Sequence, residues 1–65
     1  MPLQLGQAVV LRVGNYEYVG RICKMYATGF CCVQFEGNCA RLLLESLEAT
    51  DQDAPQCDET CSDGC

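Results

Sequence analysis

The sequence predicts an all-β protein: one five-stranded small barrel followed by a flexible acidic tail that contains cysteines. Three observations lead to this prediction. Apolar and β-branched residues alternate with a period of two in several short runs. Turn residues separate these runs about every ten residues, which is typical of small barrels and sandwiches. The net charge of −5 arises entirely after residue 48, because residues 1–48 contain four basic and four acidic side chains.

The first two strands are predicted at residues 7–13 (QAVVLRV) and 17–26 (EYVGRICKMY). Alternate apolar residues of the first run share one face, because successive side chains of a strand point to opposite faces. The turn dipeptide Gly14-Asn15 separates the two runs. Gly20 lies inside the second run, which predicts a sharp bend or a bulge where a neighbouring strand crosses closely.

Three further strands are predicted at residues 30–36 (FCCVQFE), 39–44 (CARLLL) and 47–50 (LEAT), separated by turns at Gly37-Asn38 and Glu45-Ser46. Five strands this short must close on themselves to bury a core and to remove exposed edges. The side chains expected in this core are Val9, Leu11, Val13, Ile22, Val33, Phe35, Leu42, Leu44 and Leu47.

Sixty-five residues make one domain, which we divide into a barrel at residues 1–50 and a tail at residues 51–65. No stretch reaches the roughly 20 apolar residues needed to cross a membrane. The first residues, MPLQLGQ, lack the basic start and apolar run of a secretory signal. We therefore expect a cytoplasmic protein, in which seven cysteines predict thiols or metal ligands rather than a disulfide framework.

Four motifs carry a family resemblance: GQAVVL at 6–11, YVGRI at 18–22, VQFEGN at 33–38 and ESL at 45–47. Together they resemble an SH3-like small barrel of the Tudor/KOW kind. The chain is similar to small cyanobacterial Tudor-like proteins and to the SH3-like accessory subunits of photosynthetic complexes that help to dock ferredoxin. The resemblance covers residues 5–50 and implies an SH3-like barrel, a fold that hosts many unrelated functions.

Tudor domains that read methylated side chains hold the cation in a cage of about four aromatic rings. The resemblance offers Tyr16, Tyr18 and Phe35 for such a cage, with Asn38 as a polar wall. The aromatic residue expected just after the third strand is absent, because Glu36 stands there.

Three basic residues come from the first two strands: Arg12, Arg21 and Lys24. They could form a positive patch for RNA or for an acidic protein, or they could be ordinary solvated charges. Four basic residues in the whole chain are few for nucleic-acid binding, because affinity grows with the number of phosphates neutralised. The acidic tail could also fold over this patch and mask it.

The three tyrosines, Tyr16, Tyr18 and Tyr26, flank the second strand near loops where small barrels bind ligands. Beside basic residues they would suit a protein hot spot or the stacking of nucleic-acid bases. The alternative is that they cover the ends of a barrel too small to bury them.

The tail contains Cys57, Cys61 and Cys65 in a C-x3-C-x3-C spacing. Three thiolates suit a soft metal such as Cu(I), whereas a zinc site would need a fourth ligand. The alternative is a solvated tail without a cofactor. Of the other cysteines, Cys31 is expected in the core, and Cys32 faces the opposite way.

The sequence contains no histidine, no phosphate-binding loop and no nucleophile motif, so we do not expect an enzyme. We expect a noncatalytic adaptor that binds another macromolecule, a protein in preference to nucleic acid. The expected binding residues are Arg12, Asn15, Tyr16, Tyr18, Arg21, Lys24 and Asn38. The alternatives are an RNA- or DNA-binding barrel, a metal-binding or thiol-redox protein that uses the tail cysteines, and a homo-oligomer, since a core this small gains from a partner.

Overall fold

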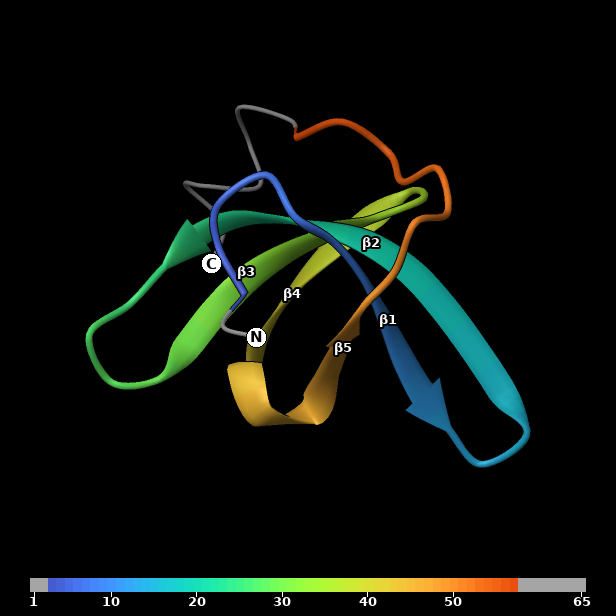
Figure 1. Ribbon diagram of the computed structural model, residues 1–65, viewed down its shortest axis with the longest axis horizontal. Helices are drawn as coiled ribbons and strands as arrows, with labels where there is room; N and C mark the ends of the chain where they lie inside the picture. Colours follow the sequence, from blue (N-terminus) through green and yellow to red (C-terminus); the bar gives the residue numbers. More distant parts are fainter. Residues whose placement is uncertain (1–2, 58–65) are drawn as a thin grey trace.

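The computed structural model describes residues 3–57 and contains one sheet of five antiparallel strands in the order β4-β3-β2-β1-β5 (Figure 1). The elements are β1 (Ala8–Val13), β2 (Tyr16–Met25), β3 (Phe30–Phe35), β4 (Asn38–Leu43), the 3-10 turn η1 (Leu44–Ser46) and β5 (Leu47–Ala49). The predicted all-β class and the five predicted strands are confirmed. The predicted closure is not complete among the described residues, because β4 and β5 lie at opposite ends of the hydrogen-bonded order.

The long strand β2 connects the two halves of the sheet. Its first part pairs with β1, from Val13↔Tyr16 to Ala8↔Arg21, and its last part pairs with β3, beginning at Arg21↔Gln34. Arg21 therefore pairs with both β1 and β3, and β2 changes from one partner strand to the other at this residue.

Gly20 lies at this change of partner, and the close strand crossing predicted from it is confirmed. A Cβ atom at position 20 would lie 2.6 Å from Val33 Cγ1, 2.7 Å from the carbonyl oxygen of Gln34 and 2.9 Å from Phe35 Cδ1. One of these atoms belongs to the backbone, which cannot move away without disturbing the sheet. A residue without a side chain is needed here so that β3 can approach β2 closely.

A β-bulge follows in the same strand. The register between β2 and β3 passes from Ile22↔Val33 to Lys24↔Cys32, so Cys23 has no opposite residue. A bulge re-aims side chains, and here it places Cys23 and Lys24 together on the face of the sheet opposite to Ile22. We call this face the outer face.

The core lies on the inner face of the bent sheet. Five buried side chains form its centre: Val9, Ile22, Cys31, Val33 and Leu47. Six partly buried side chains pack against them: Leu3, Leu11, Met25, Phe35, Leu42 and Leu44. The predicted core is thus confirmed at its centre, including Cys31, and most of the remaining predicted residues line it.

The prediction of Val13 in the core was wrong, because its side chain is 53% exposed. Val13 pairs with Tyr16 at the end of the β1–β2 hairpin, whereas β5 covers β1 only from Val9 to Leu11. The period-two pattern places Val13 on the same face as Val9 and Leu11, but β5 does not extend as far as Val13. Two residues buried on the outer face, Val10 and Cys32, were not expected in the core.

Residues 51–57 form no strand and return along the sheet to β2 (Figure 1). The composition break near Thr50 therefore coincides with the end of β5 at Ala49. The described part of the predicted tail is attached to the sheet by hydrogen bonds from Arg21 and by a disulfide between Cys23 and Cys57. No helix in the described part of the chain is long and apolar enough to cross a membrane.

The close approach at Gly20 generates the first prediction. We expect Gly20→Ala to lower the free energy of unfolding by about 1–3 kcal/mol, because the new methyl group overlaps backbone and side-chain atoms of β3. Urea unfolding measures this change. The exposed Val13→Ala is the control and should change stability by less than about 0.5 kcal/mol. Equal effects of the two substitutions would contradict the crossing.

Burial of the Cys31 thiol generates a second prediction. Burial raises the pKa of this thiol above its ordinary value of 9.0. The folded protein then holds the thiol proton more tightly than the unfolded chain does, so this stabilising term is complete below pH 9 and is lost as the pH rises through the folded-state pKa. We expect the free energy of unfolding to fall above pH 9, and Cys31→Ala to reduce that fall. Urea unfolding across this range, with Cys39→Ala as the control, checks it.

Candidate functional site

Three aromatic rings form a row at one end of the sheet. The rings of Tyr16 and Tyr18 stack with their centroids 6.5 Å apart, and the Tyr18 ring meets Phe35 edge-on at 6.5 Å. Tyr16 is 68% exposed and Tyr18 is 48% exposed. Because the β1–β2 hairpin extends beyond the rest of the sheet, nothing among the described residues buries these two rings.

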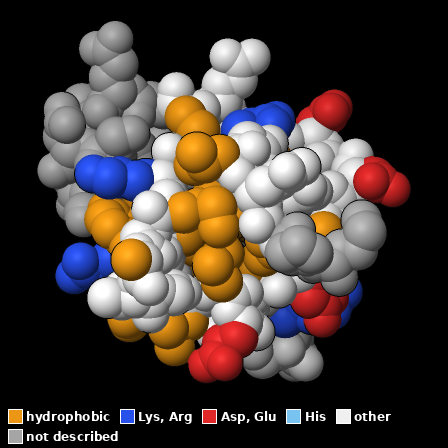
Figure 2. Space-filling view, turned by 60° about the vertical axis from the view of Figure 1, so that its left-hand side comes forward, with side chains coloured by type: hydrophobic (Ala, Val, Ile, Leu, Met, Phe, Trp, Pro, Cys, Tyr) orange, Lys and Arg blue, Asp and Glu red, His pale blue; other side chains and the backbone are white. Residues whose placement is uncertain are grey.

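A groove of about 540 Å³ opens beside this row. We call it the aromatic groove, and the lining residues used below are Glu17, Tyr18, Phe35, Glu36, Asn38 and Asp53. The groove brings together two of the predicted binding residues, since Tyr18 from β2 and Asn38 from the start of β4 both line it. Figure 2 shows a face on which hydrophobic side chains are exposed among charged ones.

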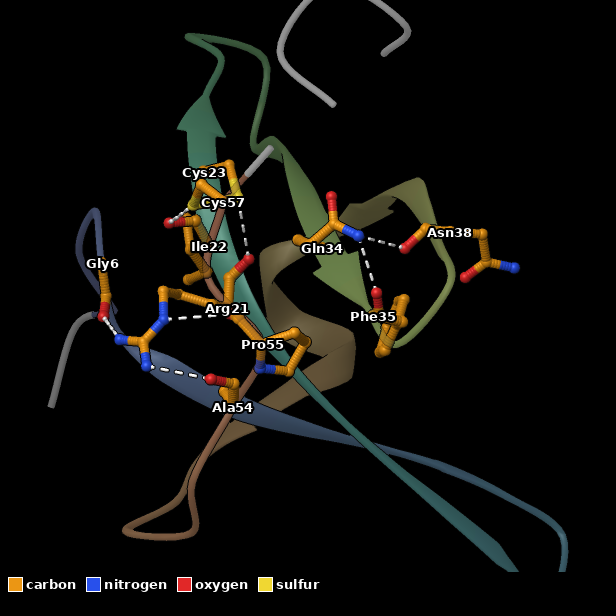
Figure 3. The surroundings of a disulfide bond; sticks show 10 residues. All are labelled: Gly6, Arg21, Ile22, Cys23, Gln34, Phe35, Asn38, Ala54, Pro55 and Cys57. Atoms are coloured by element: carbon orange, nitrogen blue, oxygen red, sulfur yellow. Dashed lines mark hydrogen bonds between the residues drawn. A yellow bond between two sulfur atoms is a disulfide. The ribbon is translucent and has the colours of Figure 1, made fainter. Parts of the chain in front are cut away.

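Gln34 fixes the turn that forms one wall of the groove. Its side-chain amide Nε2 donates hydrogen bonds to the carbonyl oxygen of Phe35 at 2.7 Å and of Asn38 at 3.0 Å (Figure 3). Gly37, within this turn, has a φ of +89°, a conformation that glycine adopts readily. These hydrogen bonds fix the backbone of Phe35, and its ring contacts Tyr18.

The groove carries negative charge. Glu17, Glu36 and Asp53 contribute carboxylates to its lining, and no lysine or arginine lines it. Aromatic rings attract cations through their faces, and carboxylates do so by their charge. The groove therefore suits a partner with basic and apolar groups, and it repels phosphate.

The predicted basic residues do not line the groove. Arg12 forms ion pairs with Glu17 and Glu48. All these side chains are exposed, so such pairs contribute about 0–1 kcal/mol each. Asn15 is exposed in the β1–β2 turn and is not part of the groove lining.

Arg21 binds backbone instead of a partner. Its Nε donates to the carbonyl oxygen of Pro55 at 3.2 Å, its Nη2 to Ala54 at 3.2 Å and its Nη1 to Gly6 at 2.8 Å. Figure 3 shows these three carbonyl groups around the guanidinium. Arg21 thus holds the returning chain, and each of its three guanidinium nitrogens donates a hydrogen bond to the backbone.

Lys24 lies apart from the groove, with residues that the sequence interpretation had not grouped with it. Its Nζ lies 5.3 Å from the centroid of the Tyr26 ring. The guanidinium of Arg41 lies 6.0 Å from the same ring and 5.9 Å from the ring of Phe30. Lys24 and Tyr26 are two residues apart in the chain, whereas the pairing of β2, β3 and β4 brings Phe30 and Arg41 to them, which their spacing in the sequence does not show.

A disulfide between Cys23 and Cys57 attaches the returning segment to the outer face (Figure 3). The two Cα atoms lie 5.6 Å apart across a sequence separation of 34. The prediction of thiols or metal ligands was wrong for these two residues. Cys23 follows the inward-facing Ile22 in β2, so its side chain lies on the outer face, where it meets Cys57. Cys32 is also disulfide-bonded, whereas Cys31 and Cys39 are thiols.

The candidate metal ligands are only partly within the described residues. Cys57 is in a disulfide, so in this form it offers no thiolate to a metal. Cys61 and Cys65 lie outside the described residues. Within residues 3–57, no three His, Cys, Asp or Glu side chains lie together so that they could hold a metal ion.

Asp53 reaches the groove only because the chain turns back after β5. Its position depends on Arg21 and on the Cys23–Cys57 disulfide, and no local pattern around Asp53 indicates it. Glu36 could have been recognised, since it directly follows Phe35 in the predicted turn.

Comparisons with protein-family models, with curated proteins and with solved structures found no match to this chain.

The disulfide generates a third prediction. We expect the double variant Cys23→Ser, Cys57→Ser to lower the free energy of unfolding by about 2–4 kcal/mol, because the cross-link no longer restricts the unfolded chain. Urea unfolding without reductant measures the loss. The same unfolding measurement is repeated with a reductant on this variant and on the natural chain. The loss of stability on reduction of the variant then gives the contribution of the Cys32 disulfide alone. A variant as stable as the natural chain would show that the bond adds nothing.

Proposed function

We propose that the protein is a noncatalytic binding module that recognises a segment of another protein in the aromatic groove. The observation that carries the proposal is the exposed pair Tyr16 and Tyr18 beside Phe35. Tyr18 lines the groove and Tyr16 stacks against the Tyr18 ring. Tyrosine is among the residue types that most often dominate protein–protein binding energy.

The groove's charge supports a protein partner in preference to nucleic acid. Glu36 and Asp53 would repel a phosphate backbone, while Glu17 is ion-paired with Arg12. Nucleic-acid binding depends instead on neutralising phosphates with lysine and arginine. A peptide with basic and apolar side chains complements both the carboxylates and the rings. The chain's net charge of −5 also favours a basic partner over a negatively charged nucleic acid.

The SH3-like resemblance belongs to this proposal. The four-stranded meander from β1 to β4, with β5 returning after η1 to pair with β1, supports it. So does the position of the groove at the loops where small barrels of this kind bind ligands. The Tudor/KOW assignment rests on the sequence motifs, and Tyr16, Tyr18 and Phe35 supply three of about four rings in the cage that this resemblance implies.

The cytoplasmic location stays a prediction, and the Cys23–Cys57 disulfide argues against it, because such bonds persist mainly in oxidising compartments. The absence of catalysis, and the tail as a Cu(I) or zinc site, also stay predictions.

Peptide selection tests the proposed function. We would select binders from a phage-displayed library of random peptides and measure their affinity by fluorescence polarisation. We expect enrichment of basic and apolar residues, and a loss of affinity of about tenfold or more in Tyr18→Ala, as for a hot-spot residue. Leu43→Ala is the matched control, since Leu43 is an exposed apolar residue on β4 that does not line the groove.

Two results would contradict the proposal. One is a set of selected peptides that bind Tyr18→Ala as well as they bind the natural chain. The other is a failure to select peptides together with binding of single-stranded RNA that weakens steeply with salt, which would favour the nucleic-acid alternative.

A further inference from the structure

The chain that returns after β5 supplies one wall of the aromatic groove. Asp53 and Pro55 line the groove and belong to residues 51–57, which we call the return segment. The other lining residues come from β1, β2, β3, β4 and the turn between the last two strands. The groove is therefore complete only while the return segment lies against the sheet.

Few contacts hold the return segment in this position. Within the described part of the chain, no backbone-to-backbone hydrogen bond joins residues 51–57 to the sheet. Two hydrogen bonds from Arg21 reach the middle of the segment, and the Cys23–Cys57 disulfide fixes its end (Figure 3). Conformational entropy opposes the ordering of every residue of the segment, and two hydrogen bonds offset only part of this cost. The position of the segment therefore depends on the disulfide.

Asp53 is an exposed carboxylate of this wall that can bind a cation. Of the three carboxylates that line the groove, Glu17 is ion-paired with Arg12. All four basic residues of the chain lie within residues 3–57, and none of them is ion-paired with Asp53 or Glu36. Two carboxylates of the groove can thus bind a basic side chain, and only Asp53 depends on the return segment for its position.

We propose that Asp53 selects a basic side chain in the peptide bound to the aromatic groove, and that the Cys23–Cys57 disulfide controls this selection by holding the return segment against the sheet. With the bond formed, the groove prefers basic peptides. With the bond reduced, the groove keeps its aromatic rings and Glu36 but loses Asp53, so it discriminates less by charge. This inference rests on the proposed function, because it concerns the same groove.

Reduction of the bond is a thiol–disulfide exchange with a small thiol such as glutathione. A glutathione thiolate attacks one sulfur of the Cys23–Cys57 bond, which breaks, and the other cysteine leaves as a thiolate that takes up a proton. A second glutathione thiolate attacks the glutathione sulfur of the resulting mixed disulfide and releases the second cysteine. Two glutathione thiols thus become one oxidised glutathione while the protein gains two thiols, so atoms and electrons balance.

The first measurement follows the return segment without any peptide. Backbone order parameters from nitrogen-15 relaxation are compared between the natural chain and the double variant Cys23→Ser, Cys57→Ser, with sucrose in both samples to keep the variant folded. We expect residues 51–54 to change from rigid values of about 0.85 to values below about 0.6, while β3 stays rigid in both proteins. A return segment that stays rigid in the variant would overturn the control by the disulfide.

The second measurement tests the charge of Asp53. The tightest peptide selected on the groove is compared by fluorescence polarisation with an analogue in which glutamine replaces each lysine and arginine. We expect Asp53→Asn to reduce the ratio of the two affinities by about two- to fivefold, as for an exposed ion pair. Asp51→Asn is the matched control, since it removes the same charge from the same segment but does not line the groove. It should leave the ratio unchanged.

Combining the variants connects the two measurements. The double cysteine variant should show the same reduced ratio as Asp53→Asn, and adding Asp53→Asn to it should reduce the ratio no further. Additive effects would overturn the control by the disulfide.

Two results would overturn the role of Asp53 alone: a ratio in Asp53→Asn equal to that of the natural chain, or selected peptides without lysine or arginine. In both cases Tyr18→Ala would still weaken peptide binding, so the proposed function would stand. A selection that yields no peptide would instead overturn the proposed function, and the role of Asp53 with it.

Discussion

The rest of the structure depends on one strand that must pair with two others in succession. β2 pairs with β1 up to Arg21 and with β3 from Arg21 onward. Its neighbour Gly20 lies so close to β3 that even a methyl group would overlap backbone atoms. Because β2 changes partner within one residue, ten residues are enough to connect both halves of the sheet. The small core around Ile22 and Val33 lies inside this bend.

The same strand organises the outer face. Arg21 and Cys23 flank the inward-facing Ile22, so both side chains lie on the outer face, and the bulge places Lys24 on that face as well. Together Arg21 and Cys23 hold the chain that returns after β5, through a disulfide to Cys57 and through hydrogen bonds to the backbone. A thin sheet of this size leaves one face open to solvent, and a covalent cross-link with a paired guanidinium stabilises the segment that covers part of it.

These attachments separate the charged groups of the molecule. Asp53 is carried to the aromatic groove, where it joins two glutamates beside Tyr18 and Phe35. Arg21 is used internally, and Lys24 joins Arg41 on another part of the sheet. The protein therefore has an acidic aromatic surface at one end and a small basic surface elsewhere. Two surfaces of opposite charge are expected to select different partners.

The sequence by itself determined the class, the strands and most of the core, because alternation with a period of two and the glycine turns are local properties of the chain. Through the family resemblance it also named Tyr18, Phe35 and Asn38, which line the aromatic groove. Only the tertiary structure decided that Val13 is exposed, because its burial depends on how far the neighbouring strand β5 extends along β1. It also decided how Cys23, Arg21 and Lys24 are used. The bulge in β2 changes the face that Lys24 occupies. The path of the chain after β5 decides that Arg21 and Cys23 meet residues 54–57. Neither can be read from the alternation of apolar and polar residues.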